Sequence, residues 1–124
     1  MLRRFRPLLL GAALAVFAVF LTGCAGDEAA TAVGPGTVVL DVRTPGEYAD
    51  GHLEGARNID LQSATFDSEV AALDPDAEYV VYCRSGSRSA LAAARMADAG
   101  VVNVTDAGGI DRAATETGLP IVAG

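Results

Sequence analysis

The sequence contains no lysine and no tryptophan, and aromatic residues make up only 6% of it. Nine arginines stand against sixteen aspartates and glutamates, which gives a formal net charge of −7 at pH 7. Proteins that bind nucleic acids or anionic lipid surfaces through charge present clusters of basic side chains to the phosphates. The composition therefore argues against nucleic acid as a partner, and any small anion must bind at a local positive site.

The N-terminal segment looks like a targeting signal rather than part of a fold. Arginines at positions 3, 4 and 6 precede an uncharged apolar run over residues 8–21, which is too short to span a bilayer comfortably and suits a secretory signal. The run ends in Leu21-Thr22-Gly23-Cys24, which resembles the lipobox of bacterial lipoproteins. That resemblance implies cleavage before Cys24 and lipid attachment to its sulfur. The alternatives are an ordinary signal peptide cut elsewhere and an uncleaved anchor.

These observations predict three segments. Residues 1–23 are the lipoprotein signal peptide, residues 24–36 are the lipidated cysteine and a flexible linker poor in large apolar residues, and residues 37–124 are one small domain. The processed chain would keep six arginines against sixteen acidic residues, a net charge of about −10. We expect an exported protein that is lipid-anchored to the bacterial cell membrane outside the cytoplasm.

Strand-like and helix-like stretches alternate along this domain. Continuous apolar runs followed by capped amphipathic segments favour an α/β fold with a parallel sheet covered on both faces. Strands are predicted over 37–42, 56–60, 78–82 and 101–104, and an extended tail over 119–122. Helices are predicted from Thr44-Pro45 to before Gly51, around Phe66–Leu73, over 87–99 and over 110–117.

Cys83 lies where a predicted buried strand ends and a helix begins. If Cys24 carries lipid, Cys83 is an unpaired thiol in a compartment where disulfides usually form, and this suggests a reactive cysteine. The small-residue loop Arg84-Ser85-Gly86-Ser87-Arg88 would point backbone N–H groups and a helix N-terminus towards an anion or a thiolate. The alternative is a buried cysteine that packs as a small hydrophobe.

Two motifs together resemble a single-domain rhodanese. The first is Leu40-Asp41-Val42-Arg43 followed by Glu47-Tyr48 and by Gly51-His52-Leu53-Glu54-Gly55-Ala56-Arg57-Asn58-Ile59; the second is Cys83-Arg84-Ser85-Gly86-Ser87-Arg88-Ser89. Gly108-Gly109 resembles the glycine pair that the family carries near its end. The resemblance implies a three-layer α/β/α domain around a central parallel sheet of about five strands. The helix that usually precedes the first strand and a tryptophan after the glycine pair have no counterpart here.

The resemblance also implies a chemistry. Cys83 would be the catalytic residue, taking sulfane sulfur from a thiosulfate-like anion as a persulfide and passing it to a thiol or cyanide. The substrate-binding residues would be Arg84, Ser85, Gly86, Ser87 and Arg88. No metal and no organic cofactor is implied, and we expect a monomer tethered to the membrane by its N-terminal lipid.

Three further residues are interpreted as structural. Asp41 and Arg43 would hold loops near the site, with Arg43 pairing with Glu47, and His52 would sit in a structural loop rather than act as a base. Two other functions stay open: a non-catalytic sulfur carrier or anion-binding module, and a phosphatase or arsenate reductase of the same superfamily. The six-residue loop from Cys83 to Arg88 disfavours the last two enzymes, because they carry one residue more.

Overall fold

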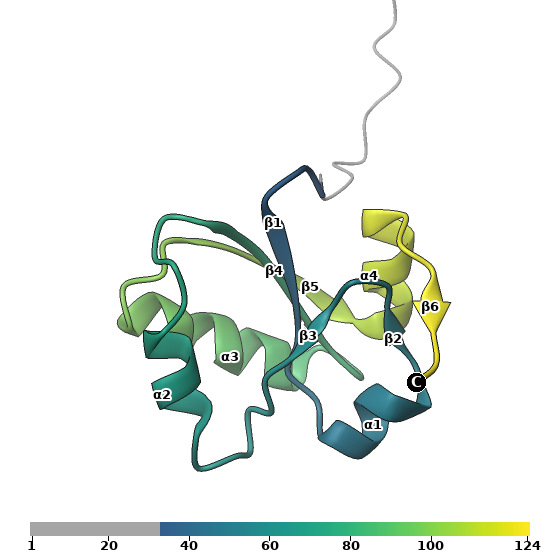
Figure 1. Ribbon diagram of the computed structural model, residues 1–124, viewed down its shortest axis with the longest axis horizontal. Helices are drawn as coiled ribbons and strands as arrows, with labels where there is room; N and C mark the ends of the chain where they lie inside the picture. Colours follow the sequence, from purple (N-terminus) through teal and green to yellow (C-terminus); the bar gives the residue numbers. More distant parts are fainter. Residues whose placement is uncertain (1–32) are drawn as a thin grey trace, which may run out of the picture.

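The computed structural model describes residues 33–124, and the predicted signal peptide and lipidated Cys24 lie outside this range (Figure 1). The elements in chain order are β1 (Thr37–Asp41), α1 (Pro45–Asp50), β2 (His52–Leu53), β3 (Arg57–Asn58), α2 (Phe66–Ala71), β4 (Glu78–Cys83), α3 (Ser87–Asp98), β5 (Asn103–Gly109), α4 (Ile110–Thr117) and β6 (Ile121–Val122). Among these residues no helix is long and apolar enough to cross a membrane.

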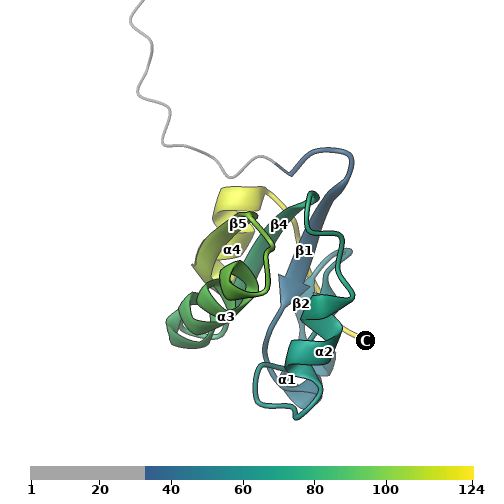
Figure 2. The ribbon, with the colours of Figure 1, turned by 90° about the vertical axis from the view of Figure 1, so that its left-hand side faces the viewer.

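Four strands form a parallel sheet in the order β3-β1-β4-β5. Figure 2 shows β5, β4 and β1 side by side in this order. β4 is the central strand, and its residues from Tyr79 to Cys83 are all buried, which explains the uninterrupted apolar run in the sequence. The α/β class and the parallel sheet are thus confirmed, and the sheet has four strands in the described part of the chain rather than about five.

A separate two-stranded antiparallel sheet joins β2 to β6, with His52 opposite Val122 and Leu53 opposite Ile121. The predicted extended tail therefore has a partner. The sequence places residues 51–56 in a loop, because a two-residue strand between glycines is too short to show alternation. Only the tertiary contact with the C-terminal segment makes these residues a strand.

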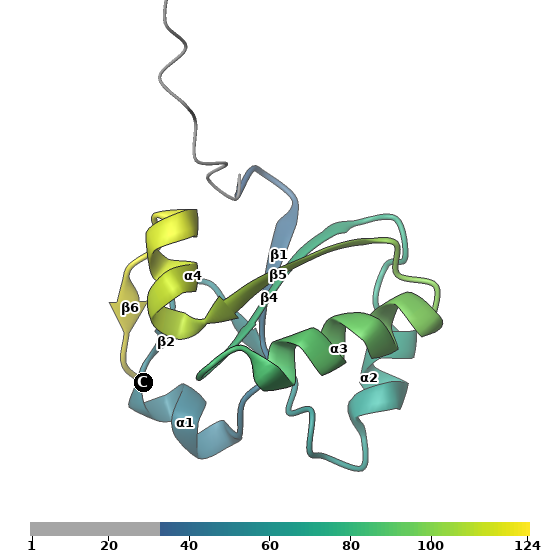
Figure 3. The ribbon, with the colours of Figure 1, turned by 180° about the vertical axis from the view of Figure 1, so that it is seen from behind.

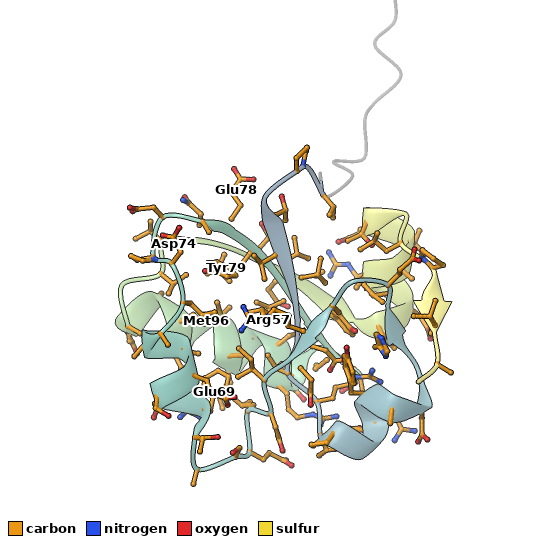
Figure 4. The ribbon with its side chains drawn as sticks, viewed as in Figure 1. Arg57, Glu69, Asp74, Glu78, Tyr79 and Met96 are labelled. Atoms are coloured by element: carbon orange, nitrogen blue, oxygen red, sulfur yellow. The ribbon has the colours of Figure 1, made fainter. Side chains whose placement is uncertain are left out.

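Helices cover both faces of the main sheet, as the three-layer expectation requires. On one face the side chains of α2 and α3, such as Phe66 and Met96, pack with Leu40 and Val81. The buried Tyr79 belongs to this layer, and its hydroxyl donates a 2.7 Å hydrogen bond to the Asp74 carbonyl at the rim (Figure 4). The side chains of Glu69 in α2 and Glu78 at the start of β4 are exposed on this side of the molecule, and that of Arg57 is exposed as well (Figure 4).

The opposite face is covered by α4 together with the small β2–β6 sheet. Leu53 and Ala113 are fully buried there against Val80 and Tyr82 of β4. The Tyr82 hydroxyl accepts a 3.0 Å hydrogen bond from the Leu53 N–H, which ties this layer to the central strand.

The short helix α1 starts as the sequence predicts. Thr44 is its N-cap, Pro45 occupies the first turn, and a capping box is complete: the Glu47 N–H donates to Thr44 Oγ1, and the Thr44 N–H donates to the Glu47 carboxylate. This capping fixes Glu47 in position beside the end of the sheet, where the Cys83 loop lies.

The end of β5 lies directly against the loop that follows β4. Gly109 is paired with Cys83, and β4 runs to the start of α3 at this end of the sheet (Figure 3). A Cβ atom on Gly109 would lie 2.7 Å from the Arg84 carbonyl oxygen, closer than van der Waals contact allows. The glycine is therefore needed for the two backbones to meet.

We predict that Gly109→Ala forces the two segments apart and lowers the free energy of unfolding by about 1–3 kcal/mol, the usual cost of overpacking. Chemical denaturation of the variant and the parent protein measures the loss. Gly46→Ala is the matched control, since nothing lies within 4 Å of the Cβ it would add. Equal destabilisation in the two variants would contradict the close-approach argument.

Candidate active site at Cys83

Cys83 is the last residue of β4, at the carboxyl end of the central strand. Ligand sites of open parallel sheets lie beyond these strand ends. The side chain points into the α2–α3 layer and has 0% of its surface exposed. It is the free cysteine of the described residues, so the single thiol that the sequence singled out stands at the expected junction.

Polar groups from the following loop surround the sulfur. The Gly86 N–H donates to Cys83 Sγ over 2.9 Å, and Ser89 Oγ lies 3.5 Å from the same sulfur. Ser89 is itself fully buried, and its hydroxyl is 3.0 Å from the Gly86 carbonyl and 3.5 Å from that of Gly108. One serine thus joins the sulfur, the loop and the glycine pair.

These groups change the acidity of the thiol. Burial disfavours the charged form and would raise the pKa of Cys83, but the hydrogen bond with the Ser89 side chain and those from the N–H groups of Ser89, Gly86 and Ser85 outweigh it. The pKa of Cys83 is therefore lowered from its ordinary value. The thiolate therefore persists to a lower pH than in an ordinary cysteine, and it is lost as the pH falls through the lowered pKa.

The loop turns at Gly86, which has a positive φ of 105° and stands as the N-cap of α3. A side chain at this φ would be strained, so glycine suits the turn that aims the N–H groups at the sulfur. Arg84, Ser85 and Ser87 are exposed around the turn. Of the predicted substrate-binding residues, Ser85 and Gly86 contribute N–H groups to the sulfur in this structure; substrate contact by all five remains a prediction.

Arg88 has a partner that the sequence did not suggest. Its Nη1 and Nη2 atoms lie 2.7 Å and 2.9 Å from the two carboxylate oxygens of Glu47, a bidentate ion pair. This pairing is the largest cause that lowers the pKa of Glu47 to about 2, with further help from the Thr44 N–H. This ion pair therefore fixes the first turn of α3 relative to the N-terminal cap of α1.

Asp41 and Arg43 form a buried pair at the end of β1. Arg43 donates from Nε and Nη2 to the Asp41 carboxylate, with the shortest contact at 2.6 Å, and Nη2 also reaches the Gly51 carbonyl at 2.5 Å. The expected pairing of Arg43 with Glu47 is wrong, because Asp41 is two residues away and fully buried, whereas Glu47 is taken by Arg88.

His52 lies away from the sulfur and packs on α1. Its ring stacks on Tyr48 with centroids 3.9 Å apart, and its Nδ1 is 2.9 Å from the Tyr48 carbonyl. Both contacts hold the turn between α1 and β2, which agrees with the structural interpretation. Among residues 33–124 no group of three or more candidate ligands is placed to hold a metal ion.

Sequence reasoning missed the roles of Ser89, Glu47 and Asn58. The side chain of Asn58 donates to the carbonyls of Asp41 and Arg43, at 3.0 and 2.8 Å, and so fixes the end of β1. Helical spacing offered one signal for Ser89, since it lies three residues after Gly86 on the turn that faces the sheet. The pairing of Glu47 with Arg88 and the hydrogen bonds of the Asn58 side chain had no such signal, because these partners are distant in sequence.

We predict that Ser89→Ala raises the pKa of Cys83, because it removes a hydrogen bond that stabilises the thiolate. The rate of Cys83 alkylation by iodoacetamide, followed against pH, should show its midpoint at a higher pH than in the parent protein, with slower reaction at neutral pH. Ser68→Ala, an exposed serine of α2, is the matched control. A profile that does not move with Ser89→Ala would remove the serine from this role.

Comparison with known proteins places these residues in a family. The rhodanese-like domain family matches residues 26–112. A thiosulfate sulfurtransferase, GlpE, of Pseudomonas paraeruginosa is 42% identical over 69 residues, which cover 56% of this chain and 61% of that protein. A second thiosulfate sulfurtransferase, PspE of Escherichia coli, is 34% identical over 71 residues, 57% of this chain and 68% of its own length. The match thus spans about three fifths of the length of GlpE.

Solved structures agree with this match. A rhodanese with anions from E. coli superposes with a TM-score of 0.59 at 31% identity, covering 71% of this chain and 99% of that one. The Alr3790 protein from Anabaena gives a TM-score of 0.63 at 24% identity, over 73% of this chain and 80% of that one, a likeness of fold alone. Since the family match covers well over half of the sequence and includes both motifs, the chain belongs to the rhodanese-like family.

Proposed function

We propose that this protein is a rhodanese-type sulfurtransferase that moves sulfane sulfur from thiosulfate, or a similar anionic donor, to a nucleophilic acceptor through a Cys83 persulfide. The observation that carries the proposal is the sulfur of Cys83 held at the end of β4 by the Gly86 N–H and the Ser89 hydroxyl, which lower its pKa. The thiosulfate sulfurtransferases among the relatives support the same reaction.

The proposed reaction is a double displacement. The Cys83 thiolate attacks the outer sulfur of thiosulfate, a new S–S bond forms, and the S–S bond of the donor breaks with its electron pair leaving on sulfite. The acceptor then attacks the outer sulfur of the persulfide, and the Cys83 thiolate is restored. With cyanide as acceptor the product is thiocyanate. No oxidant, metal or organic cofactor is required by this balance.

The backbone N–H groups of the loop can stabilise Cys83 both as a thiolate and as a persulfide. N–H groups of Ser85, Gly86 and Ser89 already stabilise the thiolate, and the same groups can stabilise the negative charge of the persulfide. Because the thiol has no exposed surface in this structure, the donor reaches it only when the residues that cover it move.

We predict that incubation of the full chain with thiosulfate adds one sulfur atom to Cys83 and that cyanide removes it. Trypsin cleaves after Arg57 and Arg84, so mass spectrometry of the alkylated peptide 58–84 reports on Cys83 separately from Cys24. Cys83→Ser should lose both the mass gain and the formation of thiocyanate, because the oxygen cannot form the persulfide.

A chain that gains sulfur without multiple turnovers would be a sulfur carrier, the first alternative. A folded chain that gains no sulfur atom would contradict the proposal. Hydrolysis of a phosphate ester or reduction of arsenate by the same preparation would then favour a phosphatase or an arsenate reductase. Sulfur transfer retained in Cys83→Ser would overturn the mechanism altogether.

We also propose that the chain is exported and anchored by lipid on Cys24. The support is the sequence alone: three arginines, an apolar run and Leu21-Thr22-Gly23-Cys24. Two or three acyl chains anchor a protein stably, whereas one binds marginally.

Cys24→Ala is therefore expected to move the protein from the membrane fraction of bacterial cells to the soluble fraction or to leave it unprocessed. Cys83→Ser, the matched cysteine replacement, should stay with the membranes. Processed Cys24→Ala protein that remains tightly lipid-anchored would contradict the assignment.

A further inference from the structure

Arg112, an exposed residue of the first turn of α4, lies against the backbone that closes the Cys83 loop. A Cβ atom on Gly108 would lie 3.5 Å from both Cδ and Nη1 of Arg112, so the arginine side chain packs over this glycine. Gly108 in turn lies against the loop, since a Cβ on Gly86 would be 3.6 Å from the Gly108 Cα. The Arg112 guanidinium is thus separated from the Cys83 loop by one glycine backbone.

Arg84 lies on the same rim from the other side. Its carbonyl touches Gly109, and its side chain is exposed with no hydrogen bond or ion pair to any residue of 33–124. Arg88 is held by Glu47, and Arg43 is held by Asp41. Arg112 is also paired, through Nε with Glu116, but its side chain is 67% exposed, against 22% for Arg88 and 7% for Arg43. Arg84 and Arg112 are therefore the arginines beside the glycine pair whose side chains are most exposed to solvent.

Positively charged groups gather at this rim, although the protein as a whole is acidic. Helices α3 and α4 both begin at this end of the sheet, with Gly86 and Gly109 as their N-caps, so two helix N-termini add to the two guanidinium groups. Three carboxylates offset this charge: Glu116 lies 2.6 Å from Arg112 Nε, Asp106 accepts from the Gly108 N–H at 2.9 Å, and Asp111 stands in the first turn of α4. The rim is therefore not a basic patch, and an anion there would be held by direct contact with the two guanidinium groups.

We propose that Arg112, together with Arg84, receives the anionic group of the sulfur donor at the mouth of the Cys83 loop and so selects sulfur oxyanions over uncharged donors. The inference rests on the proposed sulfur transfer for its biological meaning, but the anion site itself does not depend on that activity. Arg112 is a substrate-binding residue in this proposal, and the chemistry at the sulfur stays with Cys83.

The test compares two alkylating reagents of similar size on the full chain: iodoacetate, which is an anion, and iodoacetamide, which is neutral. Both reagents need the buried thiol to become exposed in the same way. The ratio of their rate constants at Cys83, read from peptide 58–84, therefore reports the local charge. Arg112→Gln is expected to lower the iodoacetate to iodoacetamide ratio by about threefold or more, and Arg112→Lys to keep most of it.

Arg95→Gln is the matched control. Arg95 also lies on a helix and is paired with a carboxylate, Asp67 at 2.6 Å, but it follows Arg88 by two turns of α3. Arg95→Gln removes the same charge from the protein but leaves the residues beside the glycine pair unchanged. The ratio of the iodoacetate and iodoacetamide rate constants should therefore stay at the value of the parent protein. Unfolding curves of the three variants verify that each is folded.

With thiosulfate and cyanide, Arg112→Gln should raise KM for thiosulfate by a similar factor and leave kcat nearly unchanged. Equal alkylation ratios in Arg112→Gln and Arg95→Gln would overturn the inference, whether or not the protein transfers sulfur. A ratio that depends on Arg112 in a chain that transfers no sulfur would keep the anion site and reject the proposed function instead.

Discussion

The carboxylate of Asp41, fully buried at the end of β1, is the constraint on which the arrangement around the site depends. A buried carboxylate without a partner costs several kcal/mol, and Arg43 compensates it with three contacts of 2.6–3.0 Å from Nε and Nη2. The same guanidinium bonds the Gly51 carbonyl and lies 5.6 Å from the centre of the Tyr82 ring. One ion pair therefore fixes β1, the turn before β2 and the central strand relative to one another.

A second ion pair extends this frame to the Cys83 loop. Glu47 belongs to the capping box of α1, and it holds Arg88 in the first turn of α3, directly after the loop. The pKa of Glu47, about 2, means that the pair stays charged at any physiological pH. Bidentate pairs of this kind add geometric specificity as well as energy. The position of the loop over the sulfur therefore depends on a helix more than thirty residues earlier in the chain.

Glycine makes the remaining contacts possible. Gly86 supplies the turn with positive φ, and Gly109 lets its backbone approach the Arg84 carbonyl. The result is a thiol that is buried and yet more acidic than an ordinary cysteine, because hydrogen bonds from Ser89 and the loop N–H groups outweigh desolvation. Burial also keeps bulk solvent from the sulfur.

The sequence by itself determined the alternation of the longer strands and helices, the cap at Thr44, the glycine turn and the place of Cys83 between β4 and α3, because these depend on neighbours within a few residues. The buried strand Glu78–Cys83 was visible as an apolar run for the same reason. Tertiary structure alone decided that Arg88 pairs with Glu47 forty-one residues away, that Arg43 pairs with Asp41 instead, and that His52–Leu53 becomes a strand beside Ile121–Val122. Ion pairs and short strands have no periodicity of their own, so only the packing of the folded chain could assign them.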